Sequence, residues 1–167
     1  MHSYCKVETE TGKFWVSCGP NGITMIHPAD QSAAAFEAMH LRRTGVKPVL
    51  GDIPASCVQA VRQAAAGRAF DAVPMDLSCL GGFHRKVLKA LQQVPRGEVR
   101  TYAWLARRVG SPKAARAVGN AMARNPIPFL IPCHRVVPSA GGTGNYGLGK
   151  EMKRDLLHRE GVRVEEL

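Results

Sequence analysis

Apolar and polar positions alternate in short runs over residues 4–26. The runs YCKVET and KFWVSC flank a turn at Thr11-Gly12, and GITMIH follows directly after GPN. Short alternating runs between turn residues are typical of a small antiparallel sheet. If Thr11-Gly12 is a two-residue loop, Cys5 and Cys18 lie opposite each other across the hairpin.

Helical spacing follows in the rest of the first half. The run SAAAFEAMH, residues 32–40, forms a candidate helix. The run ASCVQAVRQAAAG, residues 55–67, predicts a second helix that its last glycine closes. Residues 70–78, FDAVPMDLS, then read as extended chain.

A glycine pair, Gly81-Gly82, separates this half from a helical one. We therefore expect an α+β protein with an N-terminal supporting domain over residues 1–80 and a second domain over residues 81–167. The second domain opens with FHRKVLKALQQV, in which the apolar residues recur at helical spacing. The residues on that apolar stripe are Phe83, Val87, Leu88, Leu91 and Val94.

Two short helices with a tight junction are expected next. Thr101 is a suitable N-cap for YAWLARRV, and Gly110 ends that helix. Ser111-Pro112 then starts a second helix, PKAARAVGNAMAR, which Pro126 stops. This pattern is typical of a helix-turn-helix, whose second helix reads nucleic acid with its first turns, although ordinary cores also contain such pairs. The basic residues of the second helix are Lys113, Arg116 and Arg124.

Charge supports the nucleic-acid interpretation because it is unevenly distributed. The 167-residue chain has a net charge of +10. Residues 1–82 carry seven basic and seven acidic residues, whereas residues 83–167 carry sixteen basic and six acidic ones. Such asymmetry favours a polyanionic partner bound by the second half. The alternative is a basic face that only keeps the protein in solution.

Composition excludes several protein classes. Hydrophobic residues make up 45% of the chain, which is typical of a globular protein. No apolar run approaches the ~20 residues of a membrane span, and the start, MHSYCKVETE, lacks a secretory pattern. The five cysteines are odd in number and form no C-x-x-C, which indicates free thiols in a reducing compartment. We expect an intracellular protein with no membrane partner.

The segment NPIPFLIPCHRVVP, residues 125–138, carries the candidate chemistry. Its prolines exclude a helix interior or a central strand, and its apolar residues predict burial. Cys133 is its nucleophile, and Arg135 would favour the thiolate. Adjacent side chains on extended chain point to opposite faces, so His134 can activate the thiol only at a turn or through water. The alternative is a buried, inert cysteine.

One acidic residue stands at an unfavourable place. Residues 150–161, KEMKRDLLHREG, predict an amphipathic helix ending at Gly161, with Glu160 in its last turn. The helix dipole disfavours a carboxylate there, and residues placed against local preference are often functional. Glu160 could accept the imidazole N–H and complete a triad, or it is a solvated surface glutamate.

Together these motifs resemble the O6-alkylguanine-DNA alkyltransferases, also called methylated-DNA–protein-cysteine methyltransferases. The resemblance runs through roughly residues 80–163 and rests on RGEVRTYAWLA, PKAARAVGNAMARNPIPFLIPCHRVV, GGTGNYGLG and KRDLLHREG. The N-terminal half matches only as a small sheet plus a helix. The resemblance implies a ribonuclease H-like N-terminal domain and an all-helical, winged-helix-like C-terminal domain with a helix-turn-helix.

The resemblance implies roles for five catalytic residues. Cys133 is the alkyl acceptor, His134 deprotonates it through a bound water, and Glu160 is the partner of that histidine. Asn125 holds the turn before the active site, and the Tyr102 hydroxyl donates to the guanine ring. The thiolate keeps the alkyl group as a thioether, so each molecule acts once.

It also implies double-stranded DNA containing O6-alkylguanine as the partner, bound through the minor groove. The lesion must be flipped out of the stack, and Arg116 enters the space that it leaves. The residues implied to contact DNA are Tyr102, Lys113, Ala115, Arg116, Ala117, Gly119 and Arg124. The residues implied to line the base pocket are Met122, Val136, Tyr146 and the backbone of Gly147.

Further expectations follow from the same resemblance. The protein is expected to be a monomer that requires no cofactor, in the cytoplasm of a prokaryote or the nucleus of a eukaryote, with O4-alkylthymine as a further candidate substrate. Some relatives hold structural zinc in the N-terminal half. Cys5 and Cys18 are half of such a site, or two thiols packed on a hairpin.

Three other functions fit the residues less well. A binding-only relative would lack the acceptor cysteine, which is present here. A helix-turn-helix regulator leaves Tyr102, Asn125 and Glu160 unexplained. A cysteine hydrolase needs an oxyanion hole and leaves the basic half of the chain unexplained.

Overall fold

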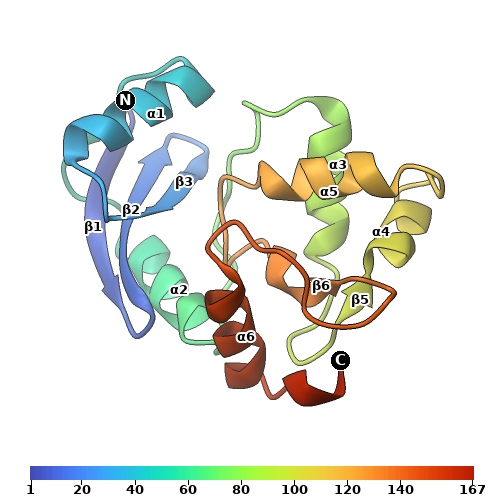
Figure 1. The fold of residues 1–167 in the computed structure, drawn as a ribbon. Coiled ribbons are helices and arrows are strands. Elements are labelled where there is room, and N and C mark those ends of the chain that lie inside the picture. Colours follow the sequence, from blue (N-terminus) through green and yellow to red (C-terminus); the bar gives the residue numbers. More distant parts are fainter. The chain divides into compact units, whose positions relative to one another are not determined.

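The computed structural model describes residues 1–167 and divides the chain into two compact units, Met1–Cys79 and Leu80–Leu167. The first unit holds a four-stranded sheet and two helices, and the second is mainly helical (Figure 1). The α+β class predicted from the sequence is confirmed at this level. None of the helices combines the length and the apolar character that crossing a bilayer requires.

The sheet of the first unit is the predicted antiparallel meander with one added edge strand. Its strands are β1 (Ser3–Thr9), β2 (Gly12–Gly19), β3 (Gly22–Pro28) and β4 (Val49–Leu50), in the order β3-β2-β1-β4. The short β4 pairs parallel with β1. Periodicity could not predict β4, because a two-residue strand has no period and both of its side chains are exposed.

The register of the first hairpin differs from the prediction. Thr9 pairs with Gly12, so the loop is Glu10-Thr11 and not Thr11-Gly12. The Thr9 hydroxyl fixes this tighter turn, because it accepts from the backbone N–H of Thr11 at 3.2 Å and donates to the carbonyl of Gly12 at 2.8 Å. The strand pairing is consequently shifted by two positions.

The expected position of Cys5 opposite Cys18 is therefore wrong. Cys18 faces Ser3, and Cys5 faces Val16. The two cysteines still share one face of the sheet, where burial and then the neighbouring Cys57 raise the pKa of the Cys18 thiol. No group of three or more histidine, cysteine, aspartate or glutamate side chains is arranged to hold a metal ion.

The two helices of the first unit cover opposite faces of its sheet (Figure 1). In α1 (Ala33–Thr44), Ser32 caps the N-terminus by accepting from Ala35 N at 3.1 Å. Helix α2 (Ala55–Ala65) is followed by Gly67 in the left-handed region. Adjacent residues of a strand point to opposite faces, so the sheet serves two cores. The core on the α1 side contains Tyr4, Trp15, Met25 and Phe36.

A fully buried histidine, His40 on α1, makes polar contacts with three other segments. Its Nδ1 lies 2.8 Å from the carbonyl of Val46, and its Nε2 lies 3.1 Å from the Thr24 hydroxyl and 3.4 Å from His2 Nδ1. A carbonyl only accepts, so Nδ1 carries the proton and Nε2 is the acceptor. Burial lowers the pKa of His40, and the bond to Val46 only partly opposes this.

We expect the free energy of unfolding to fall as the pH drops below 6.5, the ordinary pKa of the histidine. Between the lowered native pKa and 6.5 the unfolded chain binds the proton more readily than the native protein does, so acid favours unfolding. His40→Gln should lose less stability than the partly buried control His27→Gln, as measured by urea unfolding at about pH 7.5 and about pH 5.5. An equal loss in both variants would place the titrating group elsewhere.

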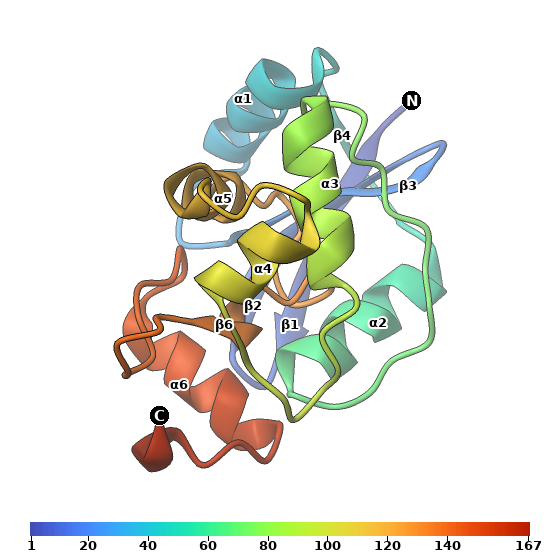
Figure 2. The same ribbon diagram turned by 90° about the vertical axis from the view of Figure 1, so that its right-hand side faces the viewer.

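The second unit is built around three packed helices, as Figure 2 shows. They are α3 (Gly82–Leu91), α4 (Tyr102–Arg108) and α5 (Ala115–Ala123), and α6 (Lys150–Arg159) follows them in the chain. The apolar stripe predicted for α3 faces the core, although Phe83 is only half-buried. The fully buried members of the stripe are Val87, Leu88, Leu91 and Val94.

The second unit is not all-helical, which corrects the prediction. The short strands β5 (Arg100–Thr101) and β6 (Val136–Val137) pair in parallel, with Arg100 opposite Val136 and Thr101 opposite Val137. Two consecutive valines favour extended backbone, and this pairing supplies their hydrogen bonds. It also brings the start of α4 beside the segment that follows Cys133.

The helix pair forms as expected, except for the start of its second helix. Thr101 caps α4 by accepting from Trp104 N at 3.0 Å, and Gly110 ends the helix with φ 77°. Ser111 does not cap the next helix, because residues 111–114 form a separate turn in which Ala114 N donates to Ser111 O at 2.9 Å. Helix α5 therefore begins at Ala115, and Lys113 lies in the junction.

Candidate active site

The proline-rich segment forms a rigid, buried wall, as its sequence predicts. Residues 126–132 are fully buried and form neither α-helix nor strand. Phe129 is the one non-glycine residue with a positive φ, 71°, a conformation that persists only where surrounding packing enforces it. A single 3₁₀ turn, η1 (Cys133–Arg135), follows and supplies the turn that the adjacent Cys133 and His134 require.

Asn125 ties this segment together from the end of α5. Its side-chain oxygen accepts from Ile127 N at 2.9 Å, and its amide nitrogen donates to the carbonyl of Ile131 at 3.0 Å and to the Cys133 sulfur at 3.3 Å. One side chain thus fixes the start of the turn, its end and the position of the thiol.

The Cys133 thiol borders a cavity of about 400 Å³ in the second unit. Residue Cys133 is 8% exposed, so this cavity is its route to a reactant. Val136, which is fully buried, does not line the cavity. The lining residues are Tyr102, Gly119, Met122, Ala123, Cys133, Asn145, Tyr146 and Gly147.

Behind the thiol, His134 is paired with a buried carboxylate. His134 Nε2 lies 2.8 Å from Glu160 Oε1, and the two side chains are 0% and 2% exposed. Burial alone would raise the pKa of Glu160, but hydrogen bonds from His134 and Arg135 outweigh it and lower the pKa to about 2. Glu160 is the C-cap of α6, so the unfavourable dipole position predicted for it is real and is offset by these two donors.

Arg135 is bound to Glu160 and not to the thiol, contrary to the expectation that it favours the thiolate. Its Nε donates to Glu160 Oε2 at 2.9 Å, and one terminal nitrogen donates to Oε1 at 2.9 Å. The other terminal nitrogen donates to the carbonyl of Val94 at 2.8 Å. Arg135 therefore holds the carboxylate in place for His134.

The tautomer of His134 follows from these contacts. The ionised carboxylate of Glu160 only accepts, so Nε2 carries the proton and Nδ1 has the free lone pair. Burial lowers the pKa of His134 despite the neighbouring carboxylate, which keeps the ring neutral and able to accept a proton. His134 Nδ1 and the Tyr146 hydroxyl are the two buried side-chain polar atoms that have no hydrogen-bond partner in the protein.

The sequence interpretation missed Lys153, which is fully buried on α6. Its Nζ donates to the carbonyl of Val136 at 2.6 Å and to that of Asn145 at 3.2 Å. Burial lowers the pKa of Lys153 to about 8, and the charge of Cys133 opposes this. The spacing of Lys153 with the buried Leu156 and Leu157 was the available signal, because it puts the lysine on the apolar stripe.

The thiol itself is under opposing influences. Burial raises the pKa of Cys133, while the hydrogen bond from Asn125 and the positive charge of Lys153 lower it. Burial also raises the pKa of Tyr102, with a further contribution from the charge of Cys133. The site therefore keeps both groups protonated at rest and surrounds the thiol with groups that stabilise its anion.

Of the residues predicted to contact DNA, Tyr102 begins α4, and the others lie on α5 and at its ends. Gly119 faces the cavity, where an added Cβ would lie 3.9 Å from the Tyr102 ring. Met122 is buried and also lines the cavity. The exposed members of the predicted set are Lys113, Ala115, Arg116, Ala117 and Arg124.

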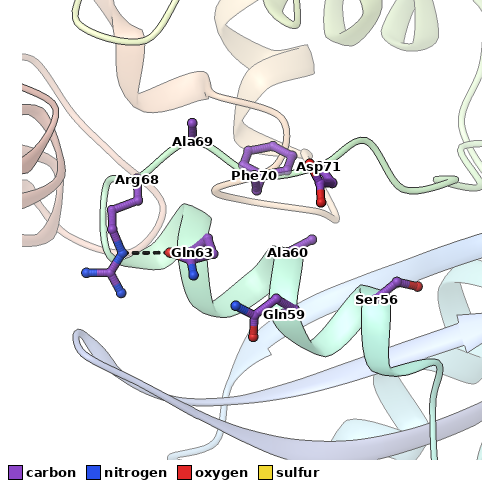
Figure 3. A pocket seen from close by; sticks show the side chains of 8 residues that line it. All are labelled: Ser56, Gln59, Ala60, Gln63, Arg68, Ala69, Phe70 and Asp71. Carbon is purple, nitrogen blue, oxygen red and sulfur yellow. Dashed lines mark hydrogen bonds between the residues drawn. The ribbon is translucent and has the colours of Figure 1, made fainter.

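A cavity of the same volume, about 400 Å³, lies in the first unit between α2 and residues 68–71 (Figure 3). Gln63 on its wall accepts from Arg68 Nε at 2.6 Å, and Phe70 provides its aromatic surface (Figure 3). Volume does not distinguish the two cavities. No thiol or imidazole lines this one, so the chemistry is assigned to the cavity at Cys133.

The arrangement at Cys133 can activate a nucleophile and hold a planar group. The neutral imidazole, oriented by a carboxylate, is a base for the thiol, and the cavity above the sulfur is lined by two tyrosines and a methionine. A thiol with a base near it, at the wall of a cavity that can hold a planar group, is suited to accept an alkyl group on its sulfur.

The chain is similar to known proteins along most of its length. Residues 82–162 match the family model of the 6-O-methylguanine DNA methyltransferase DNA-binding domain. A methylated-DNA–protein-cysteine methyltransferase from Shigella flexneri is 33% identical over 163 residues, which cover 93% of this chain and 94% of the relative. The one from Homo sapiens is 57% identical over 83 residues, 49% of this chain. That match spans only 40% of the human protein's length.

A solved structure agrees with this similarity. The crystal structure of Mycobacterium tuberculosis OGT in complex with DNA has a TM-score of 0.76 to this chain at 34% identity. The superposition covers 95% of this chain and 92% of that one.

Proposed function

The chain belongs to the family of methylated-DNA–protein-cysteine methyltransferases, and from this premise we propose that it repairs DNA by moving the alkyl group of O6-alkylguanine onto its own Cys133. One observation carries the proposal: the thiol lies at the wall of a cavity of about 400 Å³ with a buried His134–Glu160 pair behind it. The family of the chain supplies the substrate class, and the site supplies the acceptor.

The proposed reaction is a single displacement. His134 Nδ1 takes the thiol proton through a water molecule held between the two groups, for which its unpartnered, buried lone pair is suited. The sulfur attacks the alkyl carbon, so that an S–C bond forms as the C–O6 bond breaks. The leaving guanine anion receives a hydrogen bond or proton from the Tyr102 hydroxyl. The thioether is stable, so each protein molecule reacts once.

Substrate access requires the nucleotide to leave the helix. We propose that α5 docks in the minor groove, where its small residues, Ala115, Ala117 and Gly119, permit close approach. Arg116 fills the space left in the stack. Lys113 and Arg124 neutralise phosphates at the two ends of the helix, which predicts an affinity that falls steeply with salt.

The flipped base is proposed to occupy the cavity at Cys133. Met122 and Tyr146 form its sides, the backbone N–H of Gly147 lies at the alkylated oxygen, and Val136 supports the floor from behind. O4-alkylthymine would present the same alkyl–oxygen bond and is proposed as a second substrate. We propose a monomer that acts without a cofactor and without zinc at Cys5 and Cys18.

Finer fold assignments belong to the same proposal. An antiparallel meander with a fourth strand parallel to β1 supports a ribonuclease H-like N-terminal unit. Three packed helices with the α4–α5 junction, closed by β5 and β6, support a winged-helix-like C-terminal unit.

The test is the intact mass of the protein after incubation with duplex DNA that contains O6-methylguanine. We expect a gain of one methyl group on Cys133 and no second transfer. Cys133→Ala should gain nothing while still binding the DNA, and the control Cys79→Ala, a half-buried thiol outside the site, should gain one methyl group. Unmodified wild-type protein, or many transfers per molecule, would refute the proposal.

Arg116→Ala should slow methyl transfer from duplex DNA at least ~10-fold and leave transfer from a single-stranded oligonucleotide nearly unchanged, since an unpaired base has no stack to leave. The measurement is the rate of methylation of Cys133 with each substrate. Arg107→Ala, which removes an exposed arginine from α4, serves as the control and should affect neither rate. Equal slowing on both substrates would exclude a role of Arg116 in flipping.

A further inference from the structure

The basic charge of the second unit extends beyond the proposed reader helix. Nine of its lysines and arginines are exposed and make no side-chain hydrogen bond or ion pair. Three belong to α5 and its ends, and six have no function in the proposed binding mode. Those six are Arg85, Lys86 and Lys89 on α3, Arg107 on α4, and Lys150 and Arg154 on α6.

The cations of α3 are placed against the local preferences of a helix. Arg85, Lys86 and Lys89 share one side of α3, since residues three or four apart are neighbours on a helix surface. The helix contains no acidic residue that could pair with them. Like charges three or four residues apart destabilise a helix, and of these three cations only Lys89, in the last turn, is favoured by the helix dipole. Helix stability therefore does not account for this cluster, whereas a bound polyanion would.

The cluster borders the junction of the helix pair. A Cβ built on Gly110 would lie 3.9 Å from Lys86 Nζ, so this ammonium group reaches the turn between α4 and α5. Lys113, already proposed to bind a phosphate, lies in the same junction. Helix α3 also packs against both α4 and α5 (Figure 2). Lys86 thus brings the α3 cluster to the junction in which Lys113 lies.

We propose that Arg85, Lys86 and Lys89 bind the backbone phosphates of duplex DNA flanking the lesion. This inference rests on the proposed function, in which duplex DNA is the substrate. Phosphate contacts carry no sequence information, which suits a protein that must find a lesion in any sequence. These three residues would hold the duplex in register while the base leaves the stack and enters the cavity.

The test compares two matched double variants. Arg85→Gln/Lys89→Gln removes an arginine and a lysine spaced i,i+4 on α3, and Lys150→Gln/Arg154→Gln removes the same pair of residue types at the same spacing on α6. All four side chains are exposed, and none makes an ion pair. The measurement is the dissociation constant for an undamaged duplex at several salt concentrations.

For the α3 variant we expect the slope of log affinity against log salt to become shallower by roughly 1.8, about 0.9 for each lost phosphate contact, with affinity reduced at least ~10-fold at about 0.1 M salt. The α6 variant should keep the wild-type slope. Equal changes of slope in both variants would mean that only the net charge of the protein matters, which would overturn the inference. An unchanged slope in the α3 variant would overturn it as well. Lys86→Gln alone should lower the slope by roughly half as much as the α3 double variant.

Failure of this inference is distinguishable from failure of the proposed function. Methyl transfer to Cys133 at low salt and saturating DNA does not depend on the α3 cluster and should proceed in the α3 variant. If wild-type protein gains no methyl group, the proposed function is wrong regardless of the slopes.

Discussion

Glu160→Gln should slow methyl transfer to Cys133 by roughly 10²- to 10⁴-fold, the usual contribution of a positioned general base. The carboxylate accepts from His134 and twice from Arg135, and the amide would turn a donor toward one of them. A donor facing His134 Nε2 would move the ring proton to Nδ1 and remove the lone pair that takes the thiol proton. The measurement is the single-turnover rate of methylation as a function of pH.

Two further observations check this assignment. Glu166→Gln changes an exposed glutamate that pairs with Arg163, and it should leave the rate unchanged. The native pKa of Glu160, about 2, lies below the ordinary 4.5, so wild-type protein loses stabilisation from this carboxylate as the pH falls from 4.5 toward 2. The variant should lack that part of the acid sensitivity. A wild-type rate in Glu160→Gln would show that His134 needs no partner.

Lys153→Met should lower the transfer rate at about pH 7 by at least ~10-fold and shift the rate profile to higher pH, because a nearby cation favours the thiolate. Methionine keeps the length of the side chain and removes its charge. The carbonyls of Val136 and Asn145 would lose their donor, which should destabilise the protein by about 1–3 kcal/mol per buried acceptor. The dependence of the rate on pH separates the effect on the thiol from the loss of stability, since a loss of stability alone does not shift the profile to higher pH.

The control for this prediction lies on the same helix. Lys150→Met removes an exposed lysine from the first turn of α6 and should leave the pH profile in place. If Lys153→Met slows transfer equally at every pH, the lysine only supports the loop around Asn145 and does not act on the thiol.

Much of the fold could be predicted because local rules agreed with the final structure. The threonine cap of α4, the glycine after it and the apolar stripe of α3 are local features, and each forms where the pattern places it. The start of α5 was mispredicted because residues 111–114 form a separate turn, closed by the bond from Ala114 N to Ser111 O. Serine followed by proline suits the first two positions of such a turn as well as the start of a helix.

Local sequence patterns could not predict the two-residue strands or the register of the hairpin. Strands β4, β5 and β6 are too short to show a period, and each depends on a partner distant in sequence. The hairpin shifted because one hydroxyl, on Thr9, stabilises a loop one residue earlier than Thr11-Gly12. That shift moved Cys18 away from Cys5 and removed the geometric basis of their pairing.

The sequence predicted which residues belong to the candidate site better than it predicted which of them contact each other. His134 and Glu160 are hydrogen-bonded although they lie 26 positions apart in the sequence. The family resemblance implied this pair, whereas their spacing in the sequence does not predict it. Arg135 and Lys153 were misjudged or missed, because sequence proximity suggested that Arg135 would act on the thiol. The two cations have the opposite roles: Arg135 orients the carboxylate, and the charge of Lys153 lowers the pKa of the thiol.

The parallel pairing of β5 with β6 has a mechanical consequence. The chain leaves this small sheet at Thr101, passes through α4, α5 and the proline-rich segment, and returns to it at Val136. The helix that is proposed to bind DNA and the cysteine that is proposed to react therefore belong to one loop of the chain. The pairing of β5 with β6 joins the two ends of that loop. Asn125, directly after α5, donates to the Cys133 sulfur, so a tilt of α5 would also move a hydrogen-bond donor of the thiol.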